Sequence, residues 1–106
     1  MYSTNFGYSP NQGDRSIDVL ASLVLERDKI ESFSQFVISA SGTNMKCGYS
    51  VDRLPGNYAG QYVTWVTSGT KYNIPAYNDY IVFVLKCYKD ATTYMYASVD
   101  GTITFS

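Results

Sequence analysis

The stretch Ile81-Val82-Phe83-Val84-Leu85-Lys86-Cys87-Tyr88 decides the fold class of this chain. It is rich in the β-branched and aromatic residues that strands favour. Because successive side chains of a strand point to opposite faces, one face is apolar throughout: Ile81, Phe83, Leu85 and Cys87. Lys86 marks the other face as reaching solvent. The stretch therefore predicts a strand with one buried side.

Residues 44–51 alternate in the same way and predict a second strand. One face carries Met45, Cys47, Tyr49 and Val51, and the other carries Lys46, Gly48, Ser50 and Asp52. Residues 61–67 and 33–38 are rich in β-branched and aromatic residues and predict two more strands.

Near the C-terminus, residues 92–99 and 102–105 flank Asp100-Gly101. This dipeptide suits a tight type I′ turn, so the pattern predicts a hairpin there. Ile103 and Phe105 are expected to point inward from its last strand.

The first half of the chain leaves one choice open. Residues 17–25 have a period-two apolar face, yet Leu20 and Val24 also fit helical spacing. The charged residues 26–29 indicate a solvated turn, which favours a hairpin between residues 17–25 and the strand within residues 30–40.

Turn-forming residues cluster between these segments, at residues 9–13, 41–44, 54–57, 68–70 and 74–76. Together the patterns predict an all-β fold, a two-sheet antiparallel β-sandwich of about six to seven strands. At 106 residues the chain is expected to form a single domain over residues 1–106.

Composition excludes several classes of partner. The net charge is −1 and Lys and Arg do not cluster, so no nucleic acid is expected to bind. No stretch approaches the roughly 20 apolar residues that span a bilayer, so membrane insertion is not expected. The first eight residues lack the basic start and apolar run of a secretory signal peptide.

The two cysteines, Cys47 and Cys87, both fall on apolar strand faces. Two inward cysteines in a sandwich can meet across the core as a disulfide, or they can stay buried thiols. Two isolated cysteines without histidine do not make the usual zinc ligand set, and Asn78-Asp79 alone is too small a calcium site. No metal and no cofactor are therefore predicted.

Histidine is absent from the chain. This removes Ser-His and Cys-His nucleophile pairs and the commonest general base. Most carboxylates lie in predicted turns or at strand ends, where they act as solvated charges. The protein is therefore predicted not to be an enzyme.

What remains is a recognition surface built from aromatic and amide side chains. The predicted ligand-binding residues are Asp52, Arg53, Asn57, Tyr58, Trp65, Tyr77, Asn78 and Asp79. Glycans need this mixture, because sugar hydroxyls bond to polar groups and the sugar's C–H face packs on a ring. Trp65 is either the platform for that ring or a residue of the core or sheet face. The eleven tyrosines suit both strands and recognition surfaces.

A sandwich of this length that is rich in Tyr, Ser and Thr and lacks histidine resembles the very small lectins of the slime-mould haemagglutinin type. These are similar to a reduced legume-lectin sandwich and bind glycans on cell surfaces. The resemblance rests on length, composition and strand pattern over the whole chain, without a diagnostic motif. The metal-ligand cluster of the legume lectins has no match here, so their metal dependence is not implied.

The sequence thus predicts a carbohydrate-binding protein that recognises glycans or glycoproteins outside the cell or at its surface. The alternative is a protein-interaction module that uses exposed tyrosines and a sheet edge. Cell agglutination would require multivalency, for example a homo-oligomer.

Overall fold

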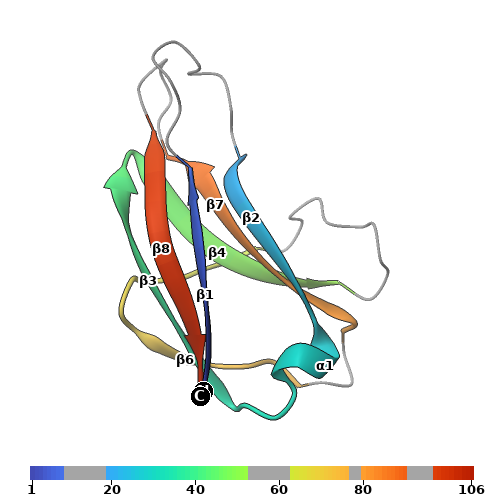
Figure 1. The fold of residues 1–106 in the computed structure, drawn as a ribbon. Coiled ribbons are helices and arrows are strands. Elements are labelled where there is room, and N and C mark those ends of the chain that lie inside the picture. The colour runs from blue at the N-terminus through green and yellow to red at the C-terminus, as the bar shows by residue number, and fades with distance from the viewer. Residues whose placement is uncertain (9–18, 53–62, 77–79, 91–96) are drawn as a thin grey trace.

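The computed structural model describes residues 1–8, 19–52, 63–76, 80–90 and 97–106. Within these ranges the chain forms eight strands and one short helix (Figure 1). The elements are β1 (Tyr2–Tyr8), β2 (Val19–Glu26), α1 (Arg27–Ile30), β3 (Gln35–Thr43), β4 (Met45–Asp52), β5 (Thr64–Trp65), β6 (Lys71–Asn73), β7 (Val82–Lys89) and β8 (Ser98–Phe105).

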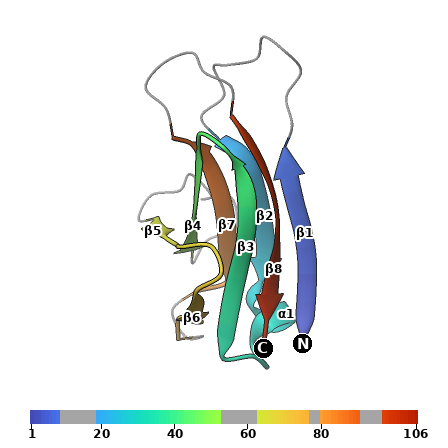
Figure 2. The same ribbon diagram turned by 90° about the vertical axis from the view of Figure 1, so that its left-hand side faces the viewer.

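The strands form two antiparallel sheets that face each other (Figure 2). In the described part of the chain the strand orders are β1-β8-β3-β6 and β2-β7-β4-β5. The first strand therefore pairs with the eighth, the second with the seventh, the third with the sixth and the fourth with the fifth. This is a long antiparallel ribbon rolled up on itself, which is the topology of the jelly roll.

The predicted two-sheet antiparallel sandwich is confirmed, and the predicted strand number is too low. The missed strands are β1 and the three-residue β6. Ser3, Asn5 and Gly7 occupy the exposed positions of β1, and Phe6 is the one residue of that strand in the buried class, so its sequence carries little apolar signal. β6 is short and forms through its pairing with β3, a partner that is distant in sequence.

The core lies between the sheets and is rich in aromatic rings. Phe36 on β3 packs edge-on against Tyr49 of β4 and Phe83 of β7, with ring centroids 5.2 and 5.3 Å apart. The described tyrosines are all buried or half-buried: Tyr2, Tyr8, Tyr49, Tyr72, Tyr80 and Tyr88. Within the described ranges, tyrosine therefore serves packing rather than an open recognition surface.

β7 is the strand that the sequence predicted most strongly, but its second face is not solvated. Phe83 lies in the core as expected, while Val84 on the opposite face is 0% exposed and Lys86 only 7%. Ile81 was expected to point inward, yet it precedes the strand and is 46% exposed. β7 runs between β2 and β4, and part of the outer face of β4 beside it is covered by Val63 and Trp65.

The predicted hairpin turn at Asp100-Gly101 is wrong, because β8 continues straight through both residues. Gly101 pairs with Phe6 of β1 and Ala40 of β3. A Cβ atom at Gly101 would stand 2.6 Å from Phe6 Cζ and 2.7 Å from the Ser39 carbonyl oxygen. Glycine is needed here for close approach of neighbouring strands, not for a turn. Ile103 and Phe105 do point inward, as expected.

Residues 19–26 form a strand rather than a helix, but β2 and β3 do not form the favoured hairpin. β2 pairs with β7 in one sheet, whereas β3 pairs with β8 in the other. The charged segment that was expected to be a turn contains the short helix α1. Residues 41–43, expected to be a loop, belong to β3, and the chain turns at Asn44, whose φ is 50°.

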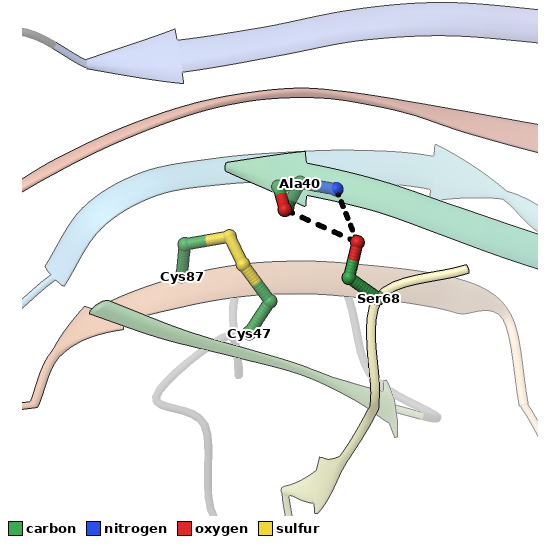
Figure 3. Close-up of a disulfide and its surroundings, with 4 residues drawn as sticks. All are labelled: Ala40, Cys47, Ser68 and Cys87. Atoms are coloured by element: carbon green, nitrogen blue, oxygen red, sulfur yellow. Dashed lines mark hydrogen bonds between the residues drawn. A yellow bond between two sulfur atoms is a disulfide. The ribbon is translucent and has the colours of Figure 1, made fainter. Parts of the chain in front are cut away.

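Cys47 and Cys87 form a disulfide with a Cα–Cα distance of 4.1 Å (Figure 3). The two residues lie directly opposite each other on β4 and β7. The bridge therefore joins neighbours within one sheet, not the two sheets across the core. It points inward, since both cysteines belong to the hydrophobic core cluster. A buried disulfide of this kind indicates an oxidising environment.

The segment between β5 and β6 passes from one sheet to the other beside this disulfide. The Val66 amide donates to the Cys47 carbonyl at 3.0 Å, and the Gly69 amide to the Ile38 carbonyl at 2.8 Å. Ser68 Oγ accepts from the Ala40 amide at 2.9 Å and donates to its carbonyl at 3.1 Å (Figure 3). The Val66 bond holds the end of β5 against β4, and the bonds of Ser68 and Gly69 attach the segment to β3.

Candidate functional site

Trp65 is the one predicted ligand-binding residue whose side chain falls in the described part of the chain. Asp52 is the last residue of β4, and the structure describes its backbone. The remaining predicted residues lie outside the described ranges: Arg53, Asn57, Tyr58, Tyr77, Asn78 and Asp79. The candidate site is therefore built outward from Trp65.

Trp65 is an exposed tryptophan on a sheet, not a residue of the core. It lies on β5, the edge strand beside β4 (Figure 2), and is 48% exposed. Its partner across the strand pair is Gly48. Residues that lie directly opposite share a face, and Gly48 alternates with the inward-facing Cys47. The indole therefore covers the outer face of the β2-β7-β4-β5 sheet.

Gly48 leaves the space that the indole needs in this position. A Cβ atom at Gly48 would clash with Val63 Cγ1, and it would stand 2.8 Å from the Thr64 carbonyl oxygen and 2.9 Å from Trp65 Cε3. Real Cβ atoms essentially never come so close. The missing side chain lets the ring lie down over β4, where it reaches Tyr88 on β7 at a centroid distance of 5.5 Å and an interplanar angle of 82°.

Lys46 brings a positive charge to the ring. Its Nζ lies 4.3 Å from the centroid of the Trp65 ring, within cation–π range. The same ammonium is 3.8 Å from Asp90 Oδ1, and both side chains are largely exposed. An aromatic face, a cation and a carboxylate thus stand together at the surface.

Tyr88 forms the wall against which the indole packs. It pairs with Lys46 across β4 and β7. Burial raises the pKa of the Tyr88 phenol above its ordinary value of 10.0. The hydroxyl is therefore protonated at neutral pH and able to donate a hydrogen bond.

The same outer face carries two polar groups that are buried among apolar neighbours. Lys86 pairs with Gly48, and Ser50 pairs with Val84, so Lys86 and Ser50 are diagonal neighbours on one face. Ser50 is 3% exposed, and its Oγ has no hydrogen-bond partner. Lys86 makes no hydrogen bond or ion pair with the described residues. We call Lys46, Trp65, Lys86 and Tyr88 the Trp65 patch.

Sequence reasoning found Trp65 but missed its three companions in this patch. Lys46 and Lys86 were noted only as solvent-facing positions on their strands. The signal that joins them to Trp65 is register, because Lys46 pairs with Tyr88 and Gly48 with both Lys86 and Trp65. Register between strands distant in sequence is not visible in the alternation of any one strand.

A second region that is hollowed enough for a ligand lies where β1 and β3 end and β8 begins. The hollow measures about 560 Å³, within the range of small-molecule sites, and its polar lining includes Tyr8, Ser41, Ser98 and Asp100. Tyr8 is half-buried against the core and the described lining holds no other aromatic ring. The half-exposed indole of Trp65 is the better platform.

Other chemistry finds little support in the described residues. They contain no group of three or more histidine, cysteine, aspartate or glutamate side chains placed to hold a metal ion. Among the same residues, no helix has the length and hydrophobicity to cross a membrane.

Comparisons with protein-family models, curated proteins and solved structures find no match to this chain.

Proposed function

We propose that this protein binds carbohydrate and that Trp65 is the platform on which a sugar ring packs. The observation that carries the proposal is the indole itself. It is 48% exposed on the outer face of a sheet, whereas every described tyrosine is at least half-buried. The C–H face of a sugar ring packs on an aromatic face, while a buried tryptophan has no surface to offer.

The neighbours of the indole supply the polar half of such a site. Lys46 is a hydrogen-bond donor and Asp90 an acceptor, and their pairing at 3.8 Å leaves both groups accessible. Sugar hydroxyls present donors and acceptors side by side and suit a mixed pair of this kind. The jelly roll occurs among lectin domains, which adds support by analogy only.

The disulfide supports a place of action outside the cell or at its surface. Such bridges persist in oxidising compartments, where exposed glycans and glycoproteins are also found. One site on a domain of this size binds weakly, so agglutination of cells would require a homo-oligomer.

The test is a glycan-array screen of the folded protein, run with calcium and with chelator. Trp65→Ala should abolish saturable binding, and Trp65→Phe should retain part of it because an aromatic face remains. The matched control is Ile81→Ala, which removes an apolar side chain of similar exposure at a different place on the fold. Binding by Trp65→Ala equal to that of the wild-type protein contradicts the proposal.

One observation favours a protein-interaction role as the second candidate. β1 and β2 are each one of the two edge strands of their sheets, and they lie close to each other. β1 carries no charged residue and β2 only Glu26, so neither edge has the lysines that discourage pairing with another strand. Retention of a deglycosylated partner that is lost in Val24→Lys, an exposed position of β2, would favour this role.

A further inference from the structure

We propose that the glycan bound at Trp65 is acidic and places a carboxylate or sulfate group between Lys46 and Lys86. This inference rests on the proposed carbohydrate-binding function and specifies the class of its ligand.

The register of β4 and β7 brings the two lysines together. Lys46 pairs with Tyr88, and Gly48 pairs with Lys86, so the two lysines occupy diagonal positions of one face. Such diagonal neighbours lie about 7–8 Å apart along the sheet. Gly48, the partner of Lys86 on β4, has no side chain, and Val63 and Trp65 lie over it. The cations therefore flank the indole, and the paired positions around it bring no acidic side chain between them.

Among the described residues, Lys86 has no counter-charge. It is 93% buried, that is 7% exposed, and no described residue forms an ion pair or hydrogen bond with it. Burial of the stem restricts the side chain, so little of its freedom is left to lose on binding. An anionic ligand group supplies the counter-charge that the described residues do not give to this ammonium.

Ser50 adds a second unpartnered group at the same place. Its Oγ has no hydrogen-bond partner, and it lies diagonal to Lys86 on the outer face. Carboxylate and sulfate oxygens accept hydrogen bonds from both hydroxyl and ammonium donors. Ser50 Oγ is thus a buried hydroxyl without an acceptor, at a position diagonal to Lys86.

The partner of Lys46 is exchangeable. Its contact with Asp90 is 3.8 Å long and lies at the surface, and exposed pairs of this kind are weak. A ligand anion takes the place of Asp90 while the sugar ring packs on the indole. Charge-assisted hydrogen bonds to the ligand are then stronger than those that a neutral hydroxyl makes.

The experiment compares matched acidic and neutral probes by calorimetry. Trigalacturonate is paired with its methyl ester, which keeps the sugar and removes the charge. A sulfated dextran oligosaccharide is paired with the unsulfated one, which separates sulfate from carboxylate as the recognised group. We expect the acidic member of one pair to bind at least about tenfold more tightly, and to weaken as salt screens the charges.

Lys46→Met and Lys86→Met should each lower the affinity for the acidic ligand by about tenfold or more, because one charge-assisted contact is lost. Methionine keeps the apolar stem of Lys86, and circular dichroism checks that the variant folds. If it does not fold, Lys46→Met and the ester comparison still decide the matter. The control is Lys71→Met, an exposed lysine on the other sheet, which should leave binding unchanged.

The outcomes separate the two proposals. Acidic and neutral probes that bind equally, with binding abolished by Trp65→Ala, would overturn the proposal of an acidic ligand. The proposed carbohydrate-binding function would stand. Loss of binding in Lys71→Met as large as in Lys46→Met also overturns it, because the attraction is then non-specific. A folded protein that binds no glycan of either kind, here or on the array, overturns both.

Discussion

Reducing the Cys47–Cys87 disulfide tests what this bridge contributes to stability. The two strands that it joins are already paired over eight residues each, so reduction removes no strand pairing from the folded protein. Its effect falls mainly on the unfolded chain, which gains the freedom of a loop of 40 residues. The chain-entropy relation gives about 13 cal/mol/K for a loop of that length, or about 4 kcal/mol at 25 °C.

Urea denaturation of the oxidised and the reduced protein measures this contribution. In a separate thermal scan, reduction should lower the midpoint by roughly 15–30 °C for a domain of this size. The far-ultraviolet circular dichroism of the reduced protein should stay native before the transition. The control is Cys47→Ala with Cys87→Ala, whose stability must not respond to the reductant. A difference of less than about 1 kcal/mol between the two states would refute the entropic reasoning.

Two further predictions concern Gly101 and Tyr88. Gly101→Ala should cost about 1–3 kcal/mol by overpacking against Phe6, and Phe6→Leu should relieve part of that cost. A double-mutant cycle of the two substitutions in urea should show a coupling energy of at least about 0.5 kcal/mol. No coupling would mean that glycine is needed for its close approach to the neighbouring backbone and not to the Phe6 ring. Burial raises the folded-state pKa of Tyr88 above 10.0, so its contribution to stability is complete below pH 10 and is lost as the pH rises through the folded pKa. Plots of unfolding free energy against pH for the wild type and Tyr88→Phe should therefore diverge above pH 10. Parallel plots would contradict a raised Tyr88 pKa as the cause.

The candidate site was only partly predictable. The sequence marked Trp65 as an aromatic residue near polar loops, but it did not decide between a platform for a sugar and a residue of the core or sheet face. The structure places the indole on the outer face of a sheet, opposite Gly48, whose missing side chain leaves room for it. Lys46 and Lys86 join the site through the pairing of β4 with β7, strands whose residues are about forty positions apart.

The alternation along residues 44–51 and 81–88 determined by itself that these segments are strands with an apolar face. Period two is a property of the extended backbone and is written locally in the chain. The all-β class and the inward direction of Cys47 and Cys87 follow from that local pattern.

Tertiary structure alone decided which strands became neighbours. It made Asp100-Gly101 the middle of β8 instead of a turn, covered the second face of β7 and placed the disulfide within one sheet. Each of these outcomes depends on contacts between residues far apart in sequence. A local pattern states that a residue is apolar, small or charged, whereas only the packed neighbours determine which surface that residue meets.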